Sequence, residues 1–211
     1  IYGGHDPGVC ALGQGAISAW LTGHPDTAGR LAEDAIALGR ELGHPFSHAI
    51  GMWFASYAFM FRGDAERCRS VAEEMHQLAQ HHAFDQMIAL ASISSGWASI
   101  DLRETGSGLK RLEQALADYR SLGQRGWLPH MLCVCADARI RAADPARALA
   151  LLEEALEMSE QTKQGILRPE MLRLQAITAL SLGRVDAAAA RTGLEAAIAL
   201  AHEQSATALE F

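Results

Sequence analysis

Residues that could do chemistry stand close together at the start of the chain, in IYGGHDPGVC, where His5 and Asp6 follow the pair Gly3 and Gly4. A glycine-rich loop that binds phosphate normally follows a strand, opens a helix and ends with a lysine and a serine or threonine. This stretch has no strand pattern before it and no lysine near it. We therefore predict a capped helix entry, with Asp6 as the N-cap, Pro7 at the first helical position, and the glycine pair letting the chain turn in.

Histidines and cysteines elsewhere do not have the spacing of a metal site. His44 and His48 are four residues apart, but Pro45 places His44 in a loop, and no third ligand lies nearby in the sequence. Cys133 and Cys135 are two residues apart, so on a helix their side chains point about 200° away from each other. We predict no metal site and no cofactor.

Serines offer one further chemistry. The segment SISSGW, residues 92–97, contains Ser94 and Ser95, but the chain has no G-x-S-x-G nucleophile elbow. A base such as His48 or His130 could reach these serines only through the fold. An unorthodox serine hydrolase, built inside a helical fold from Ser94, Ser95 and His48, therefore stays an alternative hypothesis.

Composition and charge narrow the classes of function. Of the 211 residues, 49% are hydrophobic and 20% charged, and the net charge is −7. An acidic chain is a poor ligand for nucleic acid or an anionic membrane, and no apolar run approaches the roughly 20 residues of a membrane-spanning helix. No basic stretch precedes an apolar run, so we expect no secretory signal, and four scattered cysteines are typical of a reducing cytoplasm. Because the chain begins at Ile1 and not at methionine, we expect a piece of a longer protein.

The elements that position these residues follow a period of forty. A reference column, which marks a turn, holds Gly23, Gly63, Arg103, Ala143 and Gly183. The column five residues later is always small: Ala28, Cys68, Gly108, Ala148 and Ala188. The column three residues earlier is always large and apolar: Trp20, Met60, Ile100, Ile140 and Leu180. A column twelve residues after the turn holds for four repeats and slips in the fifth: Ala35, Met75, Ala115, Ala155 and Glu195.

These columns have a physical meaning. Two helices in a hairpin approach to about 8–10 Å, and their closest crossing tolerates only small side chains. The large apolar column fills the layer between neighbouring hairpins. Between the columns apolar residues recur at helical spacing, and no sustained period-two alternation indicates strands.

We therefore predict an all-α fold, a right-handed superhelix (α-solenoid) of about five antiparallel helical hairpins in one domain, residues 1–211. The predicted hairpins are 8–42, 46–81, 84–122, 128–162 and 167–203, followed by a partial cap at 205–211. Glycine stops and Asp or Pro starts in TGHPD, FRGDAE, AADPA and LGRVD agree with these boundaries.

The column set resembles the tetratricopeptide repeat (TPR). Around WLTGHPDTAGRLAEDAIAL the matching residues are Ala16, Gly23, Ala28 and Ala35. The period of forty exceeds the usual 34 or so, and Arg103 and Ala143 stand where the turn glycine would be.

A narrower resemblance covers residues 2–48. The stretches YGGHDPGVCAL, WLTGHPDTA and LGHPFS are similar to the C-terminal repeats of large bacterial signalling ATPases, which often carry an adenylate/guanylate-cyclase-like domain. This resemblance implies a regulatory or protein-interaction scaffold whose nucleotide chemistry lies on other segments.

In a TPR-like superhelix the first helix of each hairpin lines the concave face. Counting from the turn column gives a candidate groove that passes from aromatic to charged side chains: Trp53, Tyr57, Phe61, Ile93, Trp97, Asp101, Asp137, Arg141 and Arg173. Aromatic anchors supply affinity for a peptide and charges set its register. The alternative is that Trp53 and Trp97 simply pack between hairpins.

The leading hypothesis is a non-enzymatic, cytoplasmic scaffold of a bacterial signalling protein. Its partner is a protein or peptide, or other domains of the same chain, and the oligomeric state stays open. A second hypothesis is a small-ligand sensor with an apolar pocket near Trp53, Tyr57, Met60 and Trp97 that gates an output domain. Acidic residues on the second helices, such as Glu33 and Glu73, are interpreted as solvated surface.

Overall fold

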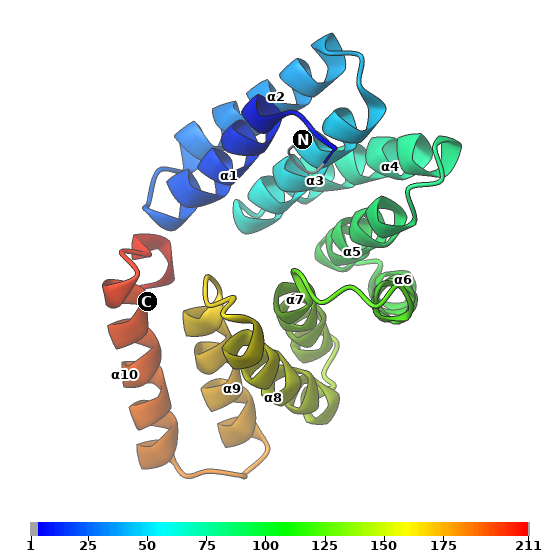
Figure 1. Ribbon diagram of the computed structural model, residues 1–211. Helices are drawn as coiled ribbons and strands as arrows, with labels where there is room; N and C mark the ends of the chain where they lie inside the picture. Colours follow the sequence, from blue (N-terminus) through cyan, green and yellow to red (C-terminus); the bar gives the residue numbers. More distant parts are fainter. Residues whose placement is uncertain (1–3, 211) are drawn as a thin grey trace. The chain divides into compact units, whose positions relative to one another are not determined.

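The computed structural model describes residues 4–210, and these residues form ten α-helices and one short 3-10 turn, without a strand (Figure 1). The helices pair as hairpins: α1 (Pro7–Leu21) with α2 (Pro25–Glu41), α3 (Pro45–Phe61) with α4 (Ala65–His81), α5 (Asp85–Asp101) with α6 (Thr105–Ser121), α7 (Leu128–Arg141) with α8 (Pro145–Thr162), and α9 (Arg168–Ser181) with α10 (Ala187–Glu203). The 3-10 turn η1 (Thr207–Leu209) follows α10. The predicted all-α fold of helical hairpins is confirmed.

Helix starts follow the capping chemistry expected from the sequence. The Asp6 carboxylate accepts a hydrogen bond from the Val9 amide at 3.0 Å, and Pro7 is the first residue of α1. Asp186 caps α10 in the same way, with 2.8 Å to the Ala189 amide. The entry of α1 is therefore a capped helix, as predicted; Gly3, the other half of the glycine pair, lies outside the described residues.

Turns inside the hairpins share one backbone conformation whatever their residue type. Gly23 and Gly63 have φ of 82° and 72°, in the left-handed region. Arg103 and Ala143, which occupy the same column, have φ of 69° and 58°. A left-handed residue with a side chain costs roughly 1–2 kcal/mol, so the hairpin geometry outweighs this local strain.

The chain divides into two compact units, the first ending at Leu122 and the second beginning at Gly123. The assignment of residues 1–211 to one domain stays a prediction, and the junction between hairpins changes at this point. In the first unit three residues, 42–44, join α2 to α3, whereas six residues, 122–127, join α6 to α7. The longer junction contains two glycines and a left-handed Trp127 with φ of 64°, so it is not the tight turn that stacks the earlier hairpins.

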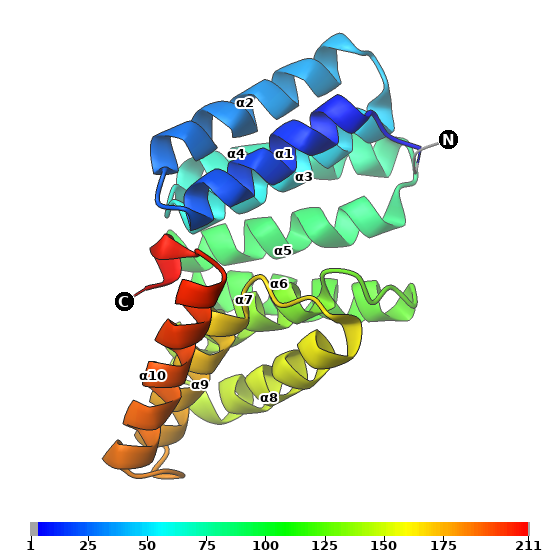
Figure 2. The same ribbon diagram turned by 60° about the vertical axis from the view of Figure 1, so that its left-hand side comes forward.

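In the first unit α1, α3 and α5 lie side by side, and α2 packs on both α1 and α3 (Figure 2). Glycines allow the close approach. A Cβ on Gly51 of α3 would lie 2.6 Å from the Ala35 carbonyl oxygen of α2, and one on Gly13 of α1 would lie 2.6 Å from the Phe54 Cβ. Helices in such contact bury most of the residues of α3 and α5.

In the fifth hairpin the predicted columns are wrong for α10, because the turn before it is longer. Its turn contains five residues, 182–186, where the other hairpins have three, such as 62–64. The two extra residues move the register of α10, so Ala190 and Ala197 occupy the small positions that the unbroken period assigns to Ala188 and Glu195. Ala190 and Ala197 are buried, while Ala188 and Glu195 are exposed.

Among residues 4–210, none of the helices combines the length and the apolar character needed to cross a lipid bilayer.

Candidate functional site

The aromatic half of the predicted groove forms a row of rings on α3 and α5. Trp53, Tyr57, Ile93 and Trp97 are all buried. The Trp53 ring lies 4.5 Å from Phe54 and 6.1 Å from Tyr57, centroid to centroid. These side chains therefore contribute to the packed interior, and their assignment to a partner-binding groove stays a prediction.

Two members of the predicted set lie nearer the solvent, at the ends of the first helices. Phe61 is partly buried and stacks on Trp20 with 4.9 Å between ring centroids. Asp101 is exposed at the last position of α5. The edge of the first unit thus shows one aromatic ring and one carboxylate of the predicted groove.

In the second unit the charged members come together on α7 and α9. Asp137 pairs with Arg141 at 2.9 Å, and Arg173 makes two hydrogen bonds to Glu170, at 2.6 and 2.7 Å. The bonds that Arg173 donates to Glu170 raise the pKa of Arg173, and the charge of Asp137 adds to that effect. Burial raises the pKa of the neighbouring Cys133 thiol well above its usual range, which keeps it neutral and unreactive. The charges Asp137, Glu170, Arg141 and Arg173 balance, so this cluster is a local ion-pair network.

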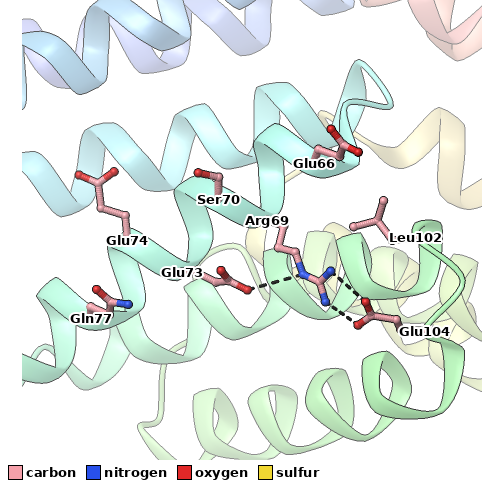
Figure 3. A pocket seen from close by; sticks show the side chains of 8 residues that line it. All are labelled: Glu66, Arg69, Ser70, Glu73, Glu74, Gln77, Leu102 and Glu104. Carbon is pink, nitrogen blue, oxygen red and sulfur yellow. Dashed lines mark hydrogen bonds and ion pairs between the residues drawn. The ribbon is translucent and has the colours of Figure 1, made fainter.

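A surface groove of about 610 Å³ runs along α4 and the turn between α5 and α6 (Figure 3). We call it the α4 groove, and these residues line it: Glu66, Arg69, Ser70, Glu73, Glu74, Gln77, Leu102 and Glu104. Figure 3 shows Arg69 between Glu73 and Glu104. The guanidinium donates to Glu104 at 2.9 Å and lies 3.5 Å from Glu73.

An equivalent groove of about 700 Å³ lies one hairpin earlier, along α2 and the end of α3. We call it the α2 groove, and these residues line it: Asp26, Thr27, Gly29, Arg30, Leu31, Glu33, Asp34, Phe59 and Arg62. Six of its positions recur forty residues later in the α4 groove, at 66, 69, 70, 73, 74 and 102. Three of those six are acidic in both grooves: Asp26 and Glu66, Glu33 and Glu73, Asp34 and Glu74.

Arginines from neighbouring hairpins neutralise part of this acidity. Arg67 of α4 makes two 2.7 Å hydrogen bonds to Glu33 of α2, and these bonds raise the pKa of Arg67. Arg40 of α2 pairs with Glu74 of α4 at 3.0 Å. The bond from Arg69 lowers the pKa of the Glu104 carboxyl. Ion pairs between hairpins therefore connect the two grooves.

One carboxylate in each groove stays available. Asp34 in the α2 groove and Glu66 in the α4 groove are exposed and have no hydrogen bond or ion pair among the residues described. The sequence interpretation missed the grooves because it treated the acids of the second helices as a uniform solvated face. The signal was present, since acids recur at three positions with the period of the repeat.

The residues of the alternative hypotheses have other partners. The buried Ser94 hydroxyl lies 2.9 Å from the Ser56 hydroxyl, and Ser95 accepts a hydrogen bond from Arg111 at 3.1 Å. The His48 Nε2 lies 3.9 Å from Glu74. A buried hydroxyl is not accessible to a substrate, so the structure gives the hydrolase hypothesis no support. Residues 4–210 contain no group of three or more potential ligands that could hold a metal ion.

Comparison with known proteins shows the class of fold. No family model matches the chain. An uncharacterized protein of Rhizobium meliloti (strain 1021) is 32% identical over 209 residues, which are 99% of this chain and 20% of that protein. The chain thus spans about a fifth of the length of that relative.

Solved structures that resemble the chain include the following two. The apo form of RapI has a TM-score of 0.63 and 11% identity, covering 95% of this chain and 71% of that one. A Podosopora anserina protein described as a kinesin light chain with nearly identical TPR-like repeats has a TM-score of 0.57 and 16% identity, covering 92% and 94%. At such identities the likeness concerns the fold alone. The chain is therefore an all-α, TPR-like helical-repeat protein.

Proposed function

We propose that this chain is a protein-binding repeat segment, and that a basic stretch of its partner docks along the α2 and α4 grooves of the first unit. The observation that carries the proposal is the recurrence of acidic residues at three equivalent positions in two open grooves, forty residues apart. A repeat that presents the same charge twice suits a partner with repeated cations.

The spacing of the acidic residues determines the spacing of the cations expected in the partner. Along each groove, acidic residues seven helical positions apart, such as Glu66 and Glu73, are separated by about 10.5 Å at 1.5 Å per residue, which is close to three residues of extended chain. Asp34 and Glu66 are the carboxylates available to new partners in the two grooves. We therefore expect a lysine or arginine at about every third position of the docked segment.

The ion pairs formed with a partner would be weak individually, because the carboxylates of the grooves are exposed to solvent. Each ion pair between exposed side chains contributes about 0.2–1 kcal/mol and weakens with salt, because counterions screen charges over about 10 Å at 0.1 M ionic strength. Several such pairs give a fast, salt-sensitive complex rather than a permanent one.

Fluorescence anisotropy tests the proposal with a labelled 15-residue peptide that carries lysine at every third position, and with the same peptide carrying glutamate there. The chain should bind the lysine peptide and not the glutamate peptide, and the affinity should fall as salt rises. The double variant Asp34→Lys/Glu66→Lys should weaken binding at least tenfold.

A matched control reverses two exposed acids of the second unit, in Glu153→Lys/Glu203→Lys, and changes the net charge by the same amount. This variant should bind the lysine peptide within twofold of the parent chain. Equal losses in the two double variants would mean that overall charge, and not the grooves, attracts the peptide.

The predicted inner-face set is a second candidate surface for a protein partner. The observation in its favour is that Asp137, Arg141 and Arg173 gather beside Glu170 on one face of the second unit. If a partner binds there, Arg141→Glu should weaken its binding, whereas Asp34→Lys should not. Because Trp53 and Trp97 are buried, their alanine variants report on folding as well as binding.

The wider context is also a proposal. We propose that this repeat segment belongs to a cytoplasmic bacterial signalling protein whose enzymatic domains lie on other segments, since residues 2–48 resemble repeats of signalling ATPases and a relative is about five times longer. Sequencing the gene on both sides of this segment tests it. An ATPase or cyclase reading frame supports it, and an unrelated domain contradicts it.

A further inference from the structure

The backbone after α10 has the same geometry as the backbone that leads into α5. Before α5, Ala83 has φ of 54°, its amide donates to the Gln80 carbonyl at 3.3 Å, and the Phe84 amide donates to Ala79 at 2.9 Å. After α10, Ser205 has φ of 53°, its amide donates to His202 at 3.0 Å, and the next amide, of Ala206, donates to Ala201 at 2.9 Å. The backbone after α10 therefore has the conformation that, after α4, leads into the next helix.

A side-chain hydrogen bond repeats in the same place. The Gln164 side-chain amide donates to the Arg125 carbonyl at 3.4 Å, across the junction before α9. Forty residues later, the Gln204 side-chain amide donates to the Gly165 carbonyl at 3.0 Å. The junction after α10 is therefore fixed to its predecessor in the same way as the junction after α8.

The turn η1 begins two residues after the left-handed Ser205, just as α5 begins two residues after the left-handed Ala83. Its third residue, Leu209, is buried, as is Met87, the third residue of α5. The hairpin beside it is incompletely covered. Leu180, in the large apolar column, is 42% exposed, whereas Met60 and Ile100 in the same column are 5% and 6% exposed.

A second apolar side chain of the α9–α10 hairpin is also more exposed than its equivalents in the other hairpins. Leu194 is the eighth residue of α10 and is partly exposed. The eighth residues of the other second helices are all buried: Ala32, Ala72, Leu112 and Leu152. In the first hairpin, the large apolar residue Trp20 stacks with Phe61 of α3, the first helix of the following hairpin.

We propose that the α9–α10 hairpin is the docking surface for a further helix, which begins at Thr207 as a continuation of this polypeptide and covers Leu180 and Leu194. This surface is separate from the α2 and α4 grooves. The docked helix has the pattern of its predecessors, with a small residue at the crossing and a large apolar residue four positions later. The occupant is thus an amphipathic helix of the same protein, which extends the stack by one hairpin.

The test compares residues 1–211 with the longer protein encoded by its gene. Hydrogen exchange should show the amides of α10 protected at least tenfold more strongly in the longer protein. Leu194→Asp should remove that added protection, and should leave the exchange of α10 in the 211-residue chain within about twofold of its parent. Leu42→Asp, at a 45% exposed leucine of the first unit, is the control and should leave α10 unchanged in both.

Three results would overturn the proposal. The reading frame could lack the predicted small and large apolar spacing after Phe211, or α10 could be equally protected in both proteins. The third is a concentration-dependent dimer of the 211-residue chain that Leu180→Asp abolishes, since a second copy would then be the occupant. Loss of peptide binding in the grooves would affect none of these results.

Discussion

The two units use one repeat with different hairpin junctions and different interiors. In the first unit, α3 and α5 are 17 residues long and their junctions with the preceding hairpin contain three residues. In the second unit, α7 and α9 have 14 residues and longer junctions. The first unit is filled by aromatic rings such as Trp53 and Tyr57, whereas the second buries the imidazole of His130.

The difference shows how a helical repeat tolerates a shortened helix. The first amides of a helix have no partner within the helix and need another one. Gln164 supplies a partner just before α7: its side-chain oxygen accepts from the Trp127 amide at 2.8 Å, while its nitrogen donates to the Arg125 carbonyl. A side chain from one junction thus replaces part of a helix in the previous one.

The largest expected effect is on the interior of the first unit. Trp53→Ala removes a buried indole between Phe54 and Tyr57 and should destabilise the first unit by about 3–5 kcal/mol. Urea unfolding followed by hydrogen exchange should assign the loss to α3 and α5. The control Leu42→Ala, at an exposed leucine, should change stability by less than about 0.5 kcal/mol.

A pH experiment addresses the second unit. His130 is 2% exposed, neither ring nitrogen has a hydrogen-bond partner among the residues described, and burial lowers its pKa from 6.5 to about 4. Because the folded state disfavours the charged imidazole, the second unit should keep its full stability above pH 6.5. It should lose up to about 1.4 kcal/mol per pH unit as the pH falls towards 4.

The variant His130→Phe isolates this effect. Other groups titrate in the same range, including His48 of the first unit, whose pKa is lowered mainly by burial. Unfolding measured at pH 7.5 and pH 5 should therefore show a smaller drop for His130→Phe than for the parent chain. An identical drop in both proteins would mean that His130 is not the titrating group.

Two Gly→Ala variants test where the helices are in close contact. Gly51→Ala should destabilise the first unit by about 1–3 kcal/mol, because the added methyl meets the backbone of Ala35 and also lies 3.1 Å from the Val9 side chain. Gly106→Ala meets nothing within 4 Å and should be neutral or stabilising by up to about 1 kcal/mol. Thermal unfolding of both variants checks the contrast, and equal effects would contradict the close contact of α2 and α3.

The smallest expected effect concerns the ion pairs between hairpins. A double-mutant cycle on Arg67 and Glu33 should give a coupling of about 0.5–1 kcal/mol at low salt, because the contact is bidentate but partly exposed. The more exposed pair of Arg191 and Glu195 within α10 should give less than about 0.5 kcal/mol. If the coupling of Arg67 with Glu33 does not exceed that of the α10 pair, these ion pairs do not hold the hairpins together.

The hairpins could be predicted from the sequence because glycine stops, Asp or Pro starts and small crossing residues mark each one locally. The register of α10 could not, since two added residues, Arg184 and Val185, shift it without breaking the helical pattern. The burial of α3 was also hidden: a helix that is apolar on every side does not indicate which side faces solvent. The grooves depend on side chains about 35 residues apart, such as Arg69 and Glu104, whose pairing only the fold decides.

Native-state hydrogen exchange on the whole chain tests most directly the claim that one repeat builds two compact units of different stability. Amides of α3 and α5 should exchange as one group, and amides of α7 and α9 as another with a different free energy of opening. Trp53→Ala should accelerate only the first group. A common free energy for all four helices, lowered together by Trp53→Ala, would show a single cooperative stack and contradict the account.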